Sequence, residues 1–180
     1  MAAAYDYPKL VREAFSLKAR DKKMYIMRGA PGSGKTSLWK VLGHHDWTTA
    51  ASADDYFVNF YGEYEWNPRE LPDAHDYCKE VAKAMCEFPK TLTKCAVVID
   101  NCNVKPEHAE FYIDLAIEHG FTPYVIDVGD AGLSAEELHQ RTTDNGHNVP
   151  AHTLRRIKRE LKNYNLAFAA DPRVKYVKVR

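Results

Sequence analysis

Short apolar runs alternate with longer amphipathic segments along most of the chain. Four apolar runs have the length and composition of β-strands, at 23–28, 47–52, 95–99 and 122–128. Apolar residues recur every three or four positions in the segments that predict helices, at 8–20, 35–42, 72–88, 106–119, 134–141 and 151–163. A less regular alternation at 173–179 indicates a last strand. This order of strands and helices favours an α/β fold.

Glycine and proline residues mark where several of these helices begin and end. Gly43 stops the second helix, Pro72 and Pro89 enclose the third, and Gly120 closes the fourth. The run 95–99 is apolar at every position, as in a strand buried on both faces of a parallel sheet. We therefore expect a three-layer α/β sandwich, in which helices flank a parallel sheet.

The composition allows one domain with a substantial core. The 180 residues are 45% hydrophobic and carry no formal net charge, so we expect a single domain over 1–180. Acidic residues prevail from 54 to 80, and basic residues prevail from 155 to 180. The basic stretch would suit either a polyanion or a solvated face.

The cysteine spacing and the apolar runs indicate an intracellular protein. Cys78, Cys86, Cys95 and Cys102 form neither a C-x-x-C pair nor a zinc-binding pattern, so we expect reduced thiols. The first residues show no signal-peptide pattern, and no apolar run reaches the length of a membrane span. The expected location is the cytoplasm or the nucleus, with no membrane partner.

The strongest chemical signal is the segment 28–36, which reads RGAPGSGKT and contains the pattern G-x-x-x-x-G-K-[ST]. A strand is predicted before it and a helix after it, which is the setting of a phosphate-binding loop (P-loop). The predicted nucleotide-binding residues are Gly29, Ala30, Pro31, Gly32, Ser33, Gly34, Lys35, Thr36 and Ser37. Lys35 would contact the β- and γ-phosphates, and Thr36 would bind Mg²⁺. A turn that merely joins a strand to a helix would not need the complete motif.

Two further predicted strands end in carboxylates that suit phosphoryl transfer. Asp100 follows a buried strand, where an acid would orient Mg²⁺, although it can also cap a turn. Asp54 and Asp55 follow the second strand, and one of them would accept the proton of an acceptor hydroxyl. We favour Asp54 as the base because it lies nearer the strand end, which leaves Asp55 as an acceptor contact or a cap.

The segment 133–150 has the composition of a lid over the site. It contains few large apolar residues after Leu138, and Arg141 lies where its helical pattern ends. Arg141 would stabilise charge on the transferred phosphoryl group, or else lie at the surface. We predict Tyr64, Trp66 and Asn103 as acceptor contacts, although loop aromatics also pack on their own domain.

Four stretches of the chain resemble a known family: RGAPGSGKT at 28–36, SADDYF at 52–57, YEWNP at 64–68 and IDNCN at 99–103. Together they resemble the P-loop kinase domain of the Nedd-binding-protein family, which is similar to the bacteriophage polynucleotide 5′-kinases. The resemblance runs from about 24 to 161. It implies Lys35 and Thr36 as the phosphate and metal grip, Asp54 as general base, and Arg141 as a lid arginine on the donor phosphates.

The chain departs from the phage pattern on the acceptor side. Phe57 stands where the phage enzymes have an arginine for the phosphate of the acceptor strand. Asn145 stands in place of a second lid arginine, and Asn101 and Cys102 replace an aspartate and a threonine. The resemblance therefore supports binding of the donor nucleotide better than binding of a polynucleotide acceptor.

These observations together predict a monomeric P-loop kinase that uses Mg²⁺ and ATP or another nucleoside triphosphate. Its expected acceptor is the 5′-hydroxyl of a DNA or RNA end. One alternative is a kinase of the same fold that phosphorylates a small molecule. Another is a nucleoside-triphosphate-binding interaction module that has no acceptor chemistry.

Overall fold

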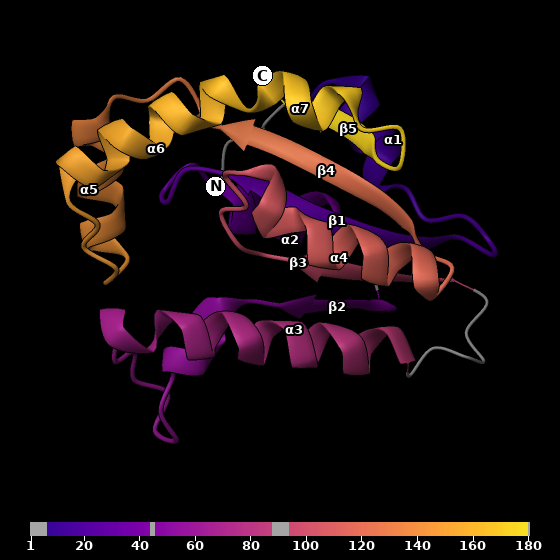
Figure 1. The fold of residues 1–180 in the computed structure, drawn as a ribbon, viewed down its shortest axis with the longest axis horizontal. Helices are drawn as coiled ribbons and strands as arrows, with labels where there is room; N and C mark the ends of the chain where they lie inside the picture. Colours follow the sequence, from indigo (N-terminus) through magenta and orange to yellow (C-terminus); the bar gives the residue numbers. More distant parts are fainter. Residues whose placement is uncertain (1–6, 44–45, 88–93, 180) are drawn as a thin grey trace.

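Five parallel strands form one sheet, with the strand order β2-β3-β1-β4-β5. The computed structural model describes residues 7–43, 46–87 and 94–179 (Figure 1). The strands are β1 (Lys22–Gly29), β2 (Thr48–Ala51), β3 (Cys95–Ile99), β4 (Thr122–Gly129) and β5 (Lys175–Lys178). All five strands predicted from the sequence are present, and the parallel sheet is confirmed.

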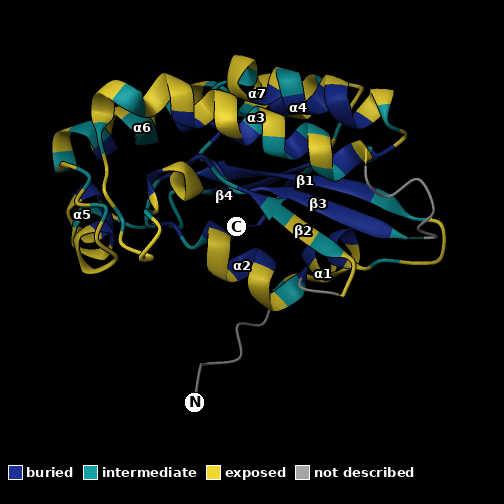
Figure 2. Cartoon of the chain, turned by 90° about the horizontal axis from the view of Figure 1, so that it is seen from below, coloured by how far each residue is buried: buried dark blue, intermediate teal, exposed yellow. Residues whose placement is uncertain are grey.

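Helices cover both faces of the sheet, which gives the expected three layers (Figure 2). The helices are α1 (Lys9–Phe15), α2 (Lys35–Leu42), α3 (Leu71–Glu87), α4 (Pro106–Glu118), α5 (Ala135–Asp144), α6 (Ala151–Asn163) and α7 (Asn165–Ala170). Two short 3₁₀ turns lie between β2 and α3, at Ala53–Phe57 and Pro68–Glu70. Helices α1 and α2 lie on one face and α3, α4 and α7 on the other, while α5 lies beyond one end of the sheet.

The apolar residues fall into two main cores, one on each face of the sheet. Every residue of β3 is buried, as its uninterrupted apolar sequence predicts. A third apolar cluster joins the P-loop to the segment after β4, and it comprises Ala30, Val104, Ala135, Leu138, Leu154 and Leu161. This cluster fixes α5 and α6 over the end of the sheet where the P-loop lies.

One helical boundary differs from the expectation. The first helix ends at Phe15 rather than near residue 20, because side chains of β1 bind the carbonyls at its end. Tyr25 Oη donates to Ala14 O at 3.0 Å, and Lys23 Nζ donates to Ala14 O at 3.1 Å and to Ser16 O at 2.5 Å. The sequence pattern also did not predict α7. The predicted end of the third helix at Pro89 lies outside the described residues.

All four cysteines are free thiols, as expected. In the described ranges, no helix combines the length and the apolar composition that crossing a bilayer requires.

A buried ion pair ties the P-loop strand to the rest of the fold. The Arg28 side chain is fully buried, and it donates to Asp127 Oδ2 at 2.5 Å. Its two terminal nitrogens also donate to the side chain of Asn165 and to the backbone oxygens of Val104 and Leu161. One guanidinium thereby connects β1, β4, α6, α7 and the segment after β3.

We predict that Asp127→Ala lowers the free energy of unfolding by about 3–5 kcal/mol, because it leaves the Arg28 charge buried without a counter-ion. Urea denaturation of the purified chain measures this loss. Glu136→Ala is the control, since it breaks the Arg155–Glu136 pair, whose side chains are each 63% exposed. The control should cost less than about 1 kcal/mol, and equal losses in the two variants would contradict the role of the buried pair.

Candidate active site

The P-loop lies between β1 and α2, as the motif predicted. Gly34 adopts a left-handed conformation at the N-terminus of α2, with φ of 92°. The Lys35 side chain is buried, and its Nζ donates to Gly29 O at 3.2 Å and to Ala30 O at 2.9 Å. The lysine therefore closes the loop on itself, with its ammonium group inside the cradle that a polyphosphate would occupy.

Gly32 brings the P-loop against α5. Its φ is +76°, and a Cβ built there would lie 3.1 Å from Leu138 O and 3.3 Å from Cβ of Arg141. Arg141 is exposed and does not line the cavity described below, but its backbone adjoins the loop. The structure thus brings Arg141 and the phosphate-binding loop together at the base of the predicted lid.

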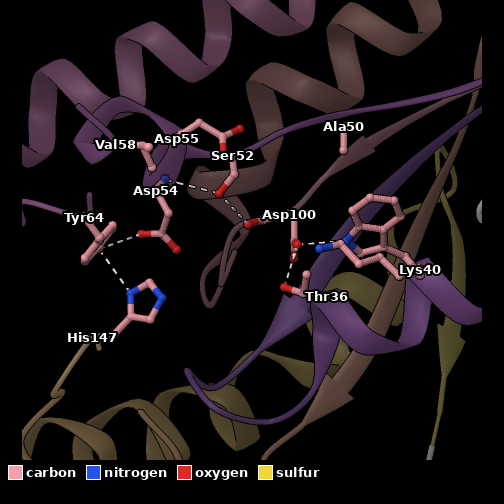
Figure 3. A pocket seen from close by; sticks show the side chains of 11 residues that line it. Thr36, Lys40, Ala50, Ser52, Asp54, Asp55, Val58, Tyr64, Asp100 and His147 are labelled. Carbon is pink, nitrogen blue, oxygen red and sulfur yellow. Dashed lines mark hydrogen bonds between the residues drawn. The ribbon is translucent and has the colours of Figure 1, made fainter. Parts of the chain in front are cut away.

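Thr36 and Asp100 meet at the N-terminal end of α2. Thr36 Oγ1 donates to Asp100 Oδ2 at 2.7 Å, and Trp39 Nε1 donates to the same oxygen at 2.8 Å (Figure 3). Asp100 Oδ1 is buried and has no hydrogen-bond partner among the described residues. A hydroxyl and a free carboxylate oxygen are hard oxygen ligands of the kind that Mg²⁺ prefers. These two residues therefore fit the metal role that the sequence assigned to them.

A cavity of about 280 Å³ extends from this point to the segment after β2. Its lining residues are Thr36, Trp39, Lys40, Ala50, Ser52, Asp54, Asp55, Val58, Tyr64, Asp100 and His147. One wall therefore carries the predicted metal residues, and the opposite wall carries both candidate bases. The side chain of Asp54 projects into the space between Tyr64 and Asp100 (Figure 3).

The two adjacent carboxylates have different surroundings. Asp54 Oδ1 accepts a hydrogen bond from Tyr64 Oη at 3.2 Å, and the Asp54 N–H donates to Ser52 Oγ. Burial raises the pKa of the Asp55 carboxyl above its ordinary value, opposed by a backbone hydrogen bond at Ser52. The charges of Asp54 and Asp100 raise the pKa of Asp55 further. Both residues line the cavity, so geometry keeps both as candidate proton acceptors.

The structure places two predicted acceptor contacts away from the cavity lining. Trp66 is 52% exposed and does not line the cavity. Asn103 is buried, and its Nδ2 donates to Met27 O at 2.8 Å, so its amide fixes the backbone of β1. Asn101 has a similar structural role, because its Oδ1 accepts from Ala53 N and orders the turn that carries Asp54.

Sequence reasoning missed several lining residues, of which His147 is the most informative. Its Nδ1 lies 3.1 Å from Tyr64 Oη, although 83 positions separate the two residues. The composition of the lid placed His147 in a polar segment but gave no signal for its partner. Trp39 and Lys40 were likewise assigned only to the helical pattern of α2.

A family model described as an AAA domain matches residues 24–164 of the chain. The chain belongs to this family. Human NEDD4-binding protein 2 is similar to this AAA domain, with 31% identity over 100 residues that make up 54% of the chain and 5% of the human protein. The resemblance to the Nedd-binding-protein family is thereby confirmed. The matched segment is a small part of the human protein's length.

Solved structures show the same fold as this AAA domain. A chain of the Pnkp1/Rnl/Hen1 RNA repair complex superposes with a TM-score of 0.62 and 16% identity, over 84% of this chain and 47% of that one. A gluconokinase from Sinorhizobium meliloti 1021 superposes with a TM-score of 0.51 and 14% identity, over 89% of this chain and 84% of that one. The chain therefore has a P-loop kinase-like fold.

We predict that Gly32→Ala destabilises the fold more than Gly120→Ala does, by roughly 1–3 kcal/mol. Both glycines have positive φ, of +76° and +74°, so both alanines meet the backbone penalty of about 1–2 kcal/mol. Only Gly32 faces a neighbouring helix, whereas a Cβ at Gly120 would meet no atom within 4 Å. Chemical denaturation of the two variants measures the difference. Equal losses of unfolding free energy in the two variants would show that the contact of Gly32 with α5 does not restrict the side chain at that position.

Proposed function

We propose that this chain is an ATP-dependent kinase that transfers the γ-phosphoryl group of ATP to a hydroxyl group. One observation carries the proposal: a single cavity has the P-loop residue Thr36 and Asp100 on one wall and Asp54 and Asp55 on the other. Phosphoryl transfer needs a neutralised donor and an oriented nucleophile. The two walls supply residues of the right kinds for both.

On the donor side, the P-loop would hold the phosphates of ATP. Lys35 Nζ, which now binds two loop carbonyls, would exchange them for phosphate oxygens, and Arg141 would approach from α5. Thr36 and Asp100 would hold Mg²⁺, which when bound neutralises charge on the β- and γ-phosphates.

On the acceptor side, a carboxylate would take the proton from the attacking hydroxyl. A bond forms between the hydroxyl oxygen and the γ-phosphorus, while the bond from the γ-phosphorus to the bridging oxygen of ADP breaks. Asp54 is our candidate for the proton acceptor because its side chain projects into the cavity (Figure 3). Ser52 Oγ supports the turn by accepting from the Asp54 N–H at 3.2 Å.

The first candidate acceptor is the 5′-hydroxyl of a nucleic acid. The resemblance to polynucleotide 5′-kinases supports it, and so does the shared fold with a chain of an RNA repair complex. The 3₁₀ turn after β2 leads into a loop whose tip carries exposed aromatic rings, with Phe60 98% and Tyr61 85% exposed. Val58 and Tyr64 of the same loop line the cavity, and exposed rings on such a loop suit stacking against unpaired bases.

A small-molecule acceptor is the second candidate, and two observations favour it. Phe57 is 4% exposed, so it supplies neither a charge nor a contact for an acceptor phosphate. Basic residues near the C-terminus are partly paired within the chain, as in Lys158–Asp130 at 2.9 Å and Arg173–Glu110 at 2.8 Å. These pairs reduce the positive charge that a polynucleotide would meet.

We expect the chain to transfer labelled γ-phosphate from ATP to DNA or RNA oligonucleotides that carry a 5′-hydroxyl. Lys35→Ala should abolish transfer, because it removes the positive charge from the phosphate cradle. Oligonucleotides that already carry a 5′-phosphate are the control for the site of transfer. Nucleosides and polyols, assayed in parallel, test the second candidate.

Each outcome of this assay separates the candidates. Transfer to nucleosides or polyols alone would replace the nucleic acid by a small molecule. If ATP binds and no acceptor is phosphorylated, the kinase proposal fails and an interaction module remains. If Lys35→Ala transfers as well as the unaltered chain, the P-loop takes no part in the reaction.

We predict that Asp54→Asn lowers kcat on the order of a hundredfold, because the amide cannot accept the hydroxyl proton. Its affinity for ATP, measured by calorimetry, should change little. Asp55→Asn is the matched variant at the neighbouring position, and its effect on kcat should be smaller. The reverse order of effects would identify Asp55, whose carboxyl has a raised pKa, as the base.

A further inference from the structure

Two segments that lie far apart in the sequence meet over the candidate base. The ring of His147, from the turn after α5, lies 4.6 Å from the ring of Tyr64, between the centroids. His147 Nδ1 is 3.1 Å from Tyr64 Oη, which in turn is 3.2 Å from Asp54 Oδ1 (Figure 3). The three side chains form one hydrogen-bonded row along the wall of the cavity.

The protons that each group carries determine which group donates in each hydrogen bond of this row. Tyr64 has a single hydroxyl proton, and Asp54 can only accept when it is ionised, so the Tyr64 hydroxyl donates to Asp54. The same hydroxyl oxygen then accepts a hydrogen bond from His147, whose ring must carry its hydrogen on Nδ1. Bonds that run in one direction polarise and strengthen each other.

Tyr64 is held firmly in this position. Its backbone pairs with Val58 in an isolated antiparallel bridge, and its ring packs edge-on against Phe57 at 6.1 Å. Burial and the nearby charge of Asp54 raise the pKa of the Tyr64 hydroxyl, so it stays protonated and remains a donor.

His147 is equally well fixed within the lid. The backbone N–H groups of His147 and Asn148 both donate to Thr142 O, at 2.8 and 3.1 Å. The Val149 N–H donates to Thr142 Oγ1 at 3.2 Å. Thr142 lies on α5, the helix that packs on Gly32 of the P-loop. One rigid turn therefore joins the donor loop to the row that ends at Asp54.

We propose that His147 and Tyr64 form a latch that closes the lid over the acceptor pocket and holds Asp54 in position for catalysis. Both are positioning residues, since they act through Asp54. The latch couples the two halves of the site, because α5 contacts the donor loop at Gly32 and the turn that follows α5 contacts the acceptor wall through His147. The catalytic part of this inference rests on the proposed function, whereas lid closure does not.

Steady-state kinetics with the acceptor that the chain phosphorylates test the catalytic part. Tyr64→Phe keeps the ring but removes both hydrogen bonds, so kcat should fall about tenfold while KM for ATP stays the same. His147→Ala should show a similar loss. His147→Asn places an amide N–H near the position of Nδ1 and should recover most of the activity, whereas His147→Gln should not.

The controls use residues of the same types outside the row. Tyr77→Phe changes a 42% exposed tyrosine on α3 that does not line the cavity, and His152→Ala changes an exposed histidine on α6. Neither should alter kcat. The double variant of Tyr64→Phe and His147→Ala should lose no more than Tyr64→Phe alone, because both changes break the same row.

Amide hydrogen exchange tests lid closure without any enzyme assay. The amides of 147–149 should exchange on the order of tenfold faster in Tyr64→Phe and His147→Ala than in the unaltered chain, and their exchange should not change in Tyr77→Phe. Unchanged exchange in the first two variants would overturn the latch. If exchange rises but kcat does not fall, the latch closes the lid without positioning Asp54. If the unaltered chain phosphorylates no acceptor, the proposed function fails and the exchange data still decide on the latch.

Discussion

The buried pair of Arg28 and Asp127 is the constraint on which the site depends. A charge removed from water is tolerated only if partners replace its hydration, and Arg28 finds them on four separate segments. Tyr176 of β5 donates to the same Asp127 oxygen. The residue directly before the P-loop is thereby bonded to both α6 and β4, so the loop, the sheet and α6 share one anchor.

The sequence predicted the parts of the fold that depend on local pattern. Strands and helices with regular apolar spacing were found because burial against a sheet face imposes that spacing. The short helix α7 was missed, since its position is set by distant partners: Phe168 packs under the Arg28 guanidinium, and Asn165 bonds to it. The burial of Arg28 itself could not be predicted, because its charge argued for the surface and its partners lie up to 137 positions away.

The residues of the candidate site also divide into those that a local sequence pattern predicts and those that distant contacts determine. Lys35, Thr36 and Asp100 could be predicted as candidates because a phosphate cradle needs a local motif and a strand end. The acceptor wall has no such motif. Its place after β3 suggested Asn103 as an acceptor contact, but the Asn103 side-chain amide donates to the backbone oxygen of Met27 instead. His147 and Tyr64 are 83 positions apart in the sequence. No local sequence pattern could therefore predict that His147 reaches this wall.

The charges of the cavity bear on how an acceptor would enter it. Asp54, Asp55 and Asp100 line the cavity, and Lys40 is the basic side chain among the lining residues. Phosphates of an acceptor would be repelled from this cavity, whereas a neutral sugar hydroxyl would not. For the first candidate acceptor, a nucleic acid would therefore insert only its terminal 5′-hydroxyl and keep its phosphates outside the cavity. In the proposed latch, closure at His147 would exclude water from this hydroxyl.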